Sequence, residues 1–305
     1  MSRIVLLLLL VAGLGNVVLG QRPLTDTQSS RLNAYQDTLK ELAYKVINSP
    51  DQAERYESNA LMVRKLVRAL QIQNSYSFDF DSLKSLSIQR SPDNAFRIFT
   101  WHVMNQNGTY RFYGAVQMKS SEQLQLHPLV DYSNNITSPQ DTLLDNNHWL
   151  GSQYYKIVPV TKNTSTPYYI LLGWKGNNVK STKKVIEVLH FKGGKPIFGM
   201  PVFEGKAAFN GKQRIIFEYS RSTSMMLNYE PEENRIVFDH LAAPSPEMES
   251  NPAFFGPDLS YDALKFANGR WKLTENVELT NRESEIDDLY IDPRKRSTDI
   301  INKLK

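Results

Sequence analysis

Residues 96–118, FRIFTWHVMNQNGTYRFYGAVQM, hold two runs of alternating side chains on either side of Asn107-Gly108. Asn-Gly between such runs is the strongest short-range signal for a β-hairpin, because both central residues of the turn need positive φ. A two-residue turn here sets the cross-strand pairs Val103 with Phe112, Trp101 with Gly114, and Phe99 with Val116. A glycine opposite Trp101 leaves room for the indole ring.

The two aromatic neighbours at the centre of this stretch, Trp101 and His102, are predicted to point to opposite sides of the hairpin, because side chains alternate along a strand. Trp101 shares an apolar side and is expected in the core. His102 lies on the mixed, wetter side with Tyr113 and Arg111. These three residues are candidates for a shallow ligand-binding patch, and ordinary surface is the structural alternative.

The composition is that of a globular protein. The chain has 305 residues, 41% hydrophobic and 22% charged, which is enough to bury a sizeable core. The net charge of +4 is slight for this length and the basic residues are dispersed, so we expect no nucleic-acid partner. The absence of cysteine excludes disulfides, zinc-thiolate centres and thiol catalysis.

The N-terminus has the pattern of a secretory signal peptide. Residues 1–20 contain one positive charge at Arg3, then an apolar run, then small residues up to Gly20. Glycine and asparagine interrupt the run, so it lacks the ~20 apolar residues that a membrane span needs. We expect cleavage before Gln21, export to the periplasm or the cell exterior, and no transmembrane segment afterwards.

Residues 21–75 are predicted to form a helical hairpin that covers a sheet. Residues 21–30 look like a loose leader, and apolar residues then recur at helical spacing. Ser49 is the expected N-cap of the second helix, with Pro50 in its first turn and Gln52 completing a capping box. The predicted apolar stripes are Leu32, Tyr35, Leu39, Leu42, Val46 and Ile47 in the first helix, and Tyr56, Ala60, Val63, Leu66, Val67 and Leu70 in the second.

From residue 76 to 281 the hydrophobic period is two, which predicts roughly eleven mostly antiparallel strands. Further hairpins are predicted at Asn-Gly 210–211, at Asn-Gly 268–269 and at Gly-Gly 193–194. In the hairpin at 268–269, Phe266 is expected to face Trp271. Residues 214–241 are interpreted as a three-stranded meander. The expected fold class is therefore α+β, with an N-terminal helical hairpin packed on an extensive antiparallel sheet, sandwich or partial barrel. Residues 282–305 form a charged C-terminal tail.

Few residues suggest chemistry. The sequence contains no phosphate-binding loop, no nucleophile elbow and no His-Glu-x-x-His, and we expect neither a cofactor nor a metal. Short turns in the meander would pair Met225 with both Glu218 and His240. Glu218 and His240 would then share one face as a candidate acid and base, or as a satisfied pair at the sheet margin. Asp239 is a further ligand-binding candidate beside His240.

Four stretches together resemble an uncharacterised family of exported proteins of Gram-negative bacteria. They are YYILLGWKGNN (168–178), RIIFEYS (214–220), RIVFDHLAAPSPE (235–247) and FFGPDLSYDAL (254–264). The resemblance spans residues 90 to 280 and implies export to the periplasm or cell exterior. It implies no activity, ligand or catalytic residue.

These observations favour a non-enzymatic binding or envelope-associated module, whose partner is a glycan, a peptide or an envelope protein. The alternative is a hydrolase with a dispersed acid/base site on the β-sheet. Its site would use Glu218 and His240, or Asp79 and Asp81, because β-rich enzymes often scatter their catalytic residues over strands and loops. A scaffold without a small ligand is the third hypothesis.

Overall fold

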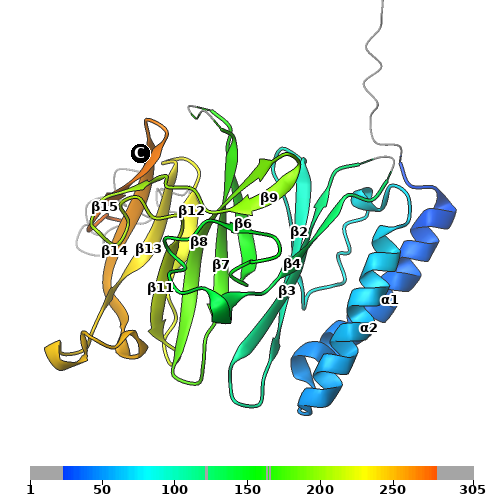
Figure 1. The fold of residues 1–305 in the computed structure, drawn as a ribbon, viewed down its shortest axis with the longest axis horizontal. Helices are drawn as coiled ribbons and strands as arrows, with labels where there is room; N and C mark the ends of the chain where they lie inside the picture. The colour runs from blue at the N-terminus through cyan, green and yellow to red at the C-terminus, as the bar shows by residue number, and fades with distance from the viewer. Residues whose placement is uncertain (1–22, 121–122, 163, 165, 280–305) are drawn as a thin grey trace, which may run out of the picture. The chain divides into compact units, whose positions relative to one another are not determined.

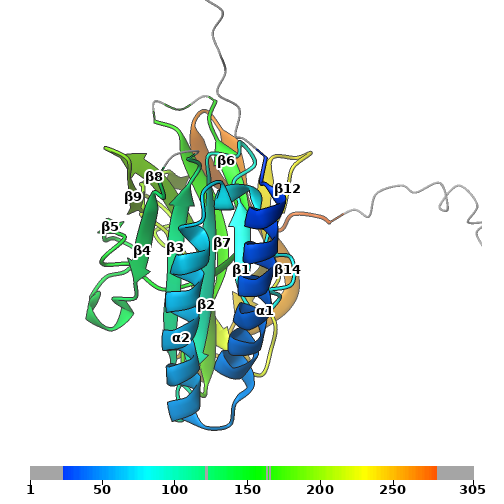
Figure 2. The same cartoon turned by 90° about the vertical axis from the view of Figure 1, so that its right-hand side faces the viewer.

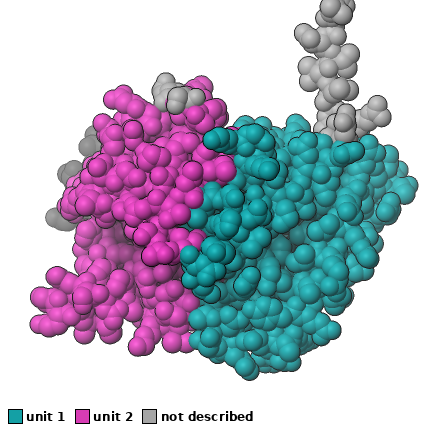
Figure 3. Space-filling view, viewed as in Figure 1, with its two compact units in different colours: residues 1–135, 144–159, 192–196 teal, residues 136–143, 160–191, 197–305 magenta. Residues whose placement is uncertain are grey.

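The chain forms two compact units that interleave along the sequence. The computed structural model describes residues 23–120, 123–162, 164 and 166–279, so the predicted signal peptide (1–20) and the charged tail (282–305) lie outside the described residues. Unit 1 combines residues 1–135, 144–159 and 192–196, and unit 2 combines residues 136–143, 160–191 and 197–305 (Figure 3). No helix in the described part of the chain is long and apolar enough to cross a membrane.

Unit 1 begins with the predicted helical hairpin. Helix α1 (Asp26–Asn48) and helix α2 (Gln52–Leu70) lie side by side over one face of a four-stranded sheet (Figure 2). The remaining elements are the 3-10 helices η1 (Ser75–Ser77) and η2 (Ser133–Asn135) and the strands β1 (Ser87–Arg90), β2 (Phe96–Met104), β3 (Tyr110–Met118), β4 (Leu126–Val130), β5 (Leu144–Asp145) and β6 (Gln153–Val160). Strands β1 to β4 pair antiparallel in chain order.

The predicted helix starts are wrong at both helices. Helix α1 begins at Asp26, inside the expected loose leader, because Thr25 and Gln28 satisfy each other's main-chain N–H groups in a capping box. The N-cap of α2 is Asp51, whose carboxylate accepts the N–H of Ala53. Ser49 instead ends α1, and its hydroxyl donates to Glu54.

The buried face of α2 is more polar than predicted. Arg55, Ser58 and Asn59 are buried, whereas Ala60, placed in the predicted apolar stripe, is exposed. Burial of Arg55 and Asn59 is tolerated because both side chains have hydrogen-bond partners. Asn59 Oδ1 accepts the indole N–H of Trp101 at 2.7 Å, and Arg55 donates to the Met104 carbonyl on β2. Leu32, Leu39, Val46, Leu66 and Leu70 of the predicted stripes do lie in the core.

The register of the 96–118 hairpin differs by one residue from the prediction. Trp101 pairs with Tyr113, and Gly114 pairs with Thr100. The loop has three residues, 106–108, closed by the Asn105 N–H donating to the Thr109 carbonyl, and within Asn107-Gly108 only the glycine has positive φ. Gly114 on β3 is required because the main chain of β2 lies close to it: a Cβ at this position would be 2.6 Å from the Phe99 carbonyl oxygen.

Trp101 and His102 point to opposite faces of β2, as predicted. Trp101 stacks on Tyr113 in the core beneath the helices, with ring centroids 5.9 Å apart. The expectation that the His102 side is the wetter one is wrong, because Ile98 and Thr100 on that side are fully buried. The Tyr154 N–H on β6 donates to the Thr100 hydroxyl there, so β2 is covered on both faces.

Unit 2 is built from two sets of strands (Figure 1). Its elements are β7 (Tyr168–Gly176), β8 (Ser181–Lys192), β9 (Lys195–Phe198), β10 (Phe203–Glu204), β11 (Ile215–Ser220), β12 (Leu227–Glu230), β13 (Arg235–Ala242), η3 (Pro246–Met248), η4 (Pro252–Phe254), β14 (Gly256–Ala267) and β15 (Arg270–Thr274). Strand β8 pairs antiparallel with β7 and with β11. The second set has the order β10-β15-β14-β13-β12, in which only the short β10–β15 pairing is parallel.

Two of the remaining turn predictions are confirmed. Asn268 and Gly269 both have positive φ and join β14 to β15, with Phe266 facing Trp271. Gly193 and Gly194 also have positive φ, between β8 and β9.

The hairpin at 210–211 and the meander over 214–241 are wrong. Gly211 lies in a turn between β10 and β11, but β10 pairs with β15 and β11 pairs with β8. Strands β12 and β13 do form a hairpin. The first strand of the supposed meander therefore belongs to another sheet. The α+β class itself is confirmed, with a helical hairpin packed on an antiparallel sheet.

Candidate functional site

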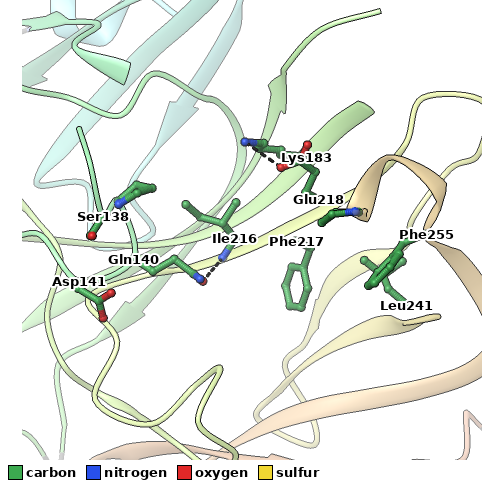
Figure 4. A pocket seen from close by; sticks show the side chains of 11 residues that line it. Ser138, Gln140, Asp141, Lys183, Ile216, Phe217, Glu218, Leu241 and Phe255 are labelled. Atoms are coloured by element: carbon green, nitrogen blue, oxygen red, sulfur yellow. Dashed lines mark hydrogen bonds and ion pairs between the residues drawn. The ribbon is translucent and has the colours of Figure 1, made fainter. Parts of the chain in front are cut away.

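A hollow of about 530 Å³ lies in unit 2 beside strand β11 (Figure 4). One side is the segment 138–141, and the centre is formed by β11 residues 216–218 with Lys183 of β8. The opposite side comes from the β13–β14 region and consists of Leu241, Pro252 and Phe255. The lining therefore combines aromatic and aliphatic side chains with two ion pairs.

A buried ion pair fixes the first side of the hollow. The Arg214 guanidinium donates through Nε to both Glu187 oxygens, at 2.8 and 3.0 Å, and both side chains are fully buried. Its remaining N–H groups donate to the carbonyls of Pro139, Thr142 and Phe198. Because these contacts hold the segment at two points, the arginine sets where residues 138–142 lie.

Among the described residues, the groups that donate to the Glu187 carboxylate are all N–H groups. Besides Arg214, its own neighbour Val188 donates a main-chain N–H at 3.0 Å. Burial raises the pKa of Glu187, and Arg214 and this N–H act against that rise. The contacts are those of an ionised carboxylate, and an ion pair buried to this extent is stable only when its hydrogen bonds are satisfied.

Gln140 joins the segment 138–142 to β11 and to the residues before it through two hydrogen bonds. Its main-chain carbonyl accepts the N–H of Gln213 at 2.8 Å. Its side-chain Oε1 accepts the N–H of Ile216 at 2.9 Å, drawn as a dashed line in Figure 4. The neighbouring Asp141 forms an ion pair of 2.6 Å with Lys212. The first side is thus anchored at both its main chain and its side chains.

Glu218 lines the hollow with its carboxylate in a complete hydrogen-bond network. It accepts from the Ser181 hydroxyl at 2.6 Å and from the Asn177 amide at 3.0 Å, and it pairs with Lys183 at 3.0 Å. Side chains of consecutive strand residues alternate, and Figure 4 shows Phe217 pointing to the other side of β11. The Phe217 ring packs on Phe238 of β13, with centroids 4.7 Å apart.

The predicted pairing of Glu218 with His240 is wrong, because β11 pairs with β8 and not with β12. His240 lies at a register shift in the β13–β14 ladder, and its Nδ1 is 2.8 Å from Asp262 Oδ2. Asp239 is occupied separately, since its carboxylate accepts the Met226 N–H at 2.6 Å. Of these three candidates, only Glu218 lines the hollow.

The structure also separates His102 from Tyr113 and Arg111. The His102 Nδ1 lies 2.9 Å from Gln153 Oε1 on one face of β2. Tyr113 lies on the other face against Trp101, and Arg111 is exposed. The predicted patch of these three residues does not form. Burial lowers the pKa of His102, and the Gln153 contact only partly offsets it.

Asp79 and Asp81 line a second, polar hollow of about 390 Å³ in unit 1. Between them Phe80 is buried with a φ of 57°. Below this loop the fully buried Arg97 donates to the Phe78 carbonyl, and burial lowers the pKa of Arg97 to about 9. Asp79 is paired with Arg90. The buried Arg97 therefore holds the start of this loop, and the two acids on either side of Phe80 line the same hollow.

Comparisons with protein-family models, with curated proteins and with solved structures found no match. Within the residues that the structure describes, no three His, Asp or Glu side chains group as a metal site would require.

Gln140, Glu187 and Arg214 were not predicted from the sequence as part of a site. For Glu187 and Arg214 there was a detectable signal: Glu187 lies within the apolar run VIEVL, and Arg214 directly precedes the apolar run IIF. Alternation along the strands places these two opposite charges at buried positions, which predicts a buried ion pair. The charges meet only if their two segments are neighbours in space, and the sequence does not specify that.

The first prediction concerns the Glu187–Arg214 pair. Replacing Arg214 by Met leaves a buried carboxylate without its cation, and this is expected to lower the free energy of unfolding by about 3–5 kcal/mol in urea denaturation. The double variant Glu187→Leu/Arg214→Met should recover part of that loss. The matched control is Lys265→Met, which removes an exposed 3.7 Å pair with Glu233 and should change stability little. Equal losses for Arg214→Met and Lys265→Met would refute the assignment.

The second prediction concerns His102. Because its pKa is lowered in the folded state, the unfolded chain binds the proton first as the pH falls below about 6.5. Stability should therefore fall on acidification from pH 7.5 to 5.5. Urea midpoints of His102→Asn should fall less over this range than those of the unaltered protein. Parallel pH dependences for the two proteins would contradict a buried, neutral imidazole.

Proposed function

We propose that this protein is an exported binding protein that holds its ligand in the hollow beside β11. The observation that carries the proposal is the combination of a fixed wall, apolar side chains and satisfied polar groups around one hollow. Binding sites typically pair apolar walls with a few placed polar groups in this way. Export is supported by the leader pattern of residues 1–20 and by the resemblance of residues 90–280 to exported proteins.

The charged groups of the hollow favour binding over catalysis. Asp141 is paired with Lys212, and Glu218 is paired with Lys183. Glu218 also accepts two further hydrogen bonds, so a proton transfer there would have to break an existing network. A general acid or base needs hydrogen-bond reach to its substrate. Because these charges are paired, the hollow favours a neutral part of a glycan, a peptide or an envelope protein.

A second candidate function is hydrolysis at His240, on a different observation. The His240 imidazole is 39% exposed, while Asp262, which holds its Nδ1, is 8% exposed. A buried carboxylate that orients an exposed imidazole is the arrangement found behind many nucleophiles. His240 lies on β13, and the neighbouring strand β14 is irregular at this level. Its Leu259 is 90% exposed and has a φ of 73°.

Binding in the hollow predicts that two adjacent phenylalanines behave differently. Phe255 lines the hollow, whereas Phe254 is 48% exposed and does not line it. In a thermal-shift and calorimetric screen of blocked short peptides and neutral oligosaccharides, Phe255→Ala should weaken any hit about tenfold. Phe254→Ala should leave the affinity within twofold. Equal effects of the two substitutions, or a screen without any hit, would contradict the proposal.

Measurements of turnover distinguish the hydrolase alternative from the binding proposal. The binding proposal predicts no hydrolysis of chromogenic esters, peptides or glycosides above the buffer rate. The alternative predicts turnover that is lost in His240→Gln. The matched control is His148→Gln, because His148 has a similar 2.8 Å contact with Asp145 but both partners are exposed. Turnover that fails only in His240→Gln would replace the binding proposal with the enzyme.

A further inference from the structure

Strand β11 is paired with β8 on one side; η4 packs against the strand, and the hollow also borders it. Its antiparallel ladder with β8 runs from Ile215, opposite Ile186, to Ser220, opposite Ser181. Two main-chain N–H groups of β11 donate to partners on the side away from β8. The Ile216 N–H donates to Gln140 Oε1 at 2.9 Å, and the Ser220 N–H donates to the Phe255 carbonyl at 2.8 Å. Main-chain groups of residues 216 and 220 therefore face away from β8.

Glu218 lies midway between these two residues. In an antiparallel strand, the N–H and C=O of one residue point to the same side, and alternate residues share that side. The main-chain N–H and C=O of Glu218 thus point away from β8 and toward the hollow. They bond to no other group within the part of the chain that the structure describes. A donor and an acceptor are presented side by side, at the spacing of a strand partner.

We infer that the ligand of the hollow is an extended peptide that adds a strand to β11 at Glu218. This inference rests on the binding function proposed above and names its ligand class. One peptide residue would exchange both main-chain hydrogen bonds with Glu218 as an antiparallel pair. Strand addition to an exposed sheet edge is a general mode of peptide recognition, in which main-chain bonds give affinity and side-chain pockets give selectivity.

The side chains around β11 define the sequence of that peptide. A residue opposite Glu218 shares its face, where the Glu218–Lys183 pair lies, so this residue is polar. Its two neighbours turn to the face of Phe217, which borders Leu241 and Phe255, so these neighbours are apolar. The pattern is one polar residue between two apolar residues.

The two ends of the open stretch limit its length and its occupant. Gln140 and Phe255 block the edge at residues 216 and 220, four residues apart, or about 13 Å of strand. Only about three peptide residues fit between these blocks. A long strand of a second copy of this chain would meet both obstacles, which favours a short extended segment of another molecule. A sugar lacks an amide N–H and C=O at strand spacing.

The test uses backbone methylation of the ligand. The probe is a pool of blocked tripeptides, acetyl-Leu-Xaa-Leu-amide with Xaa Ser, Thr, Asn or Gln, titrated into the ¹⁵N-labelled protein. The Glu218 amide resonance should shift, and N-methylation of Xaa should weaken binding about tenfold. The matched control pool is N-methylated at the second Leu, whose N–H points away from β11, and it should bind within twofold of the parent. Glu218→Ala keeps the main-chain groups and should still show the methylation effect.

The other outcomes separate this inference from the proposed function. If both methylated pools bind as tightly as the parent and shift Phe217 and Phe255, the hollow binds ligand but strand addition is wrong. If only neutral trisaccharides such as maltotriose or chitotriose shift these residues, the peptide class is wrong and the binding function stands. If neither peptides nor trisaccharides shift them, both proposals are contradicted.

Discussion

The buried ion pair between Glu187 and Arg214 is the interaction on which the candidate site depends. Removing two charges from water costs several kcal/mol for each ion, and only close pairing with complete hydrogen bonding offsets that cost. Here the guanidinium meets both carboxylate oxygens and three carbonyls of the surrounding chain. Two of those carbonyls belong to the segment 138–142, which is remote in sequence from both charged residues. The pair therefore positions a loop as well as joining β8 to the residue before β11.

That loop converts a sheet edge into a defined site. An open strand edge is normally a hazard, since its unpaired main-chain groups can template pairing with other chains. Gln140 covers this edge at Ile216, and the Phe255 carbonyl covers it at Ser220. Glu218 between them keeps a donor and an acceptor turned toward a hollow with apolar sides. Partial protection of this kind is consistent with the short peptide that we propose as ligand, and it discourages self-association through a long strand.

Features that depend on nearby residues could be predicted from the sequence, and features that depend on distant ones could not. The turn at 268–269 and the pairing of Phe266 with Trp271 follow from local residue types and from period two. The turn at 107–108 was located correctly, but a three-residue loop moved the register by one. Glu218 was identified as a candidate, yet its partners lie on β8 and not on the next strand. Neither alternation nor turn chemistry specifies which strands become neighbours across 30 or more residues of chain.

The open edge of β11 is tested most directly by hydrogen exchange of main-chain amides in the ligand-free protein, followed by NMR. The Phe217 and Tyr219 amides face β8 in the ladder and should exchange slowly. The Glu218 amide between them should exchange about a hundredfold faster or more, because no group of the described chain protects it. Equal protection of all three amides would show that this edge is closed, and would contradict the account of the site.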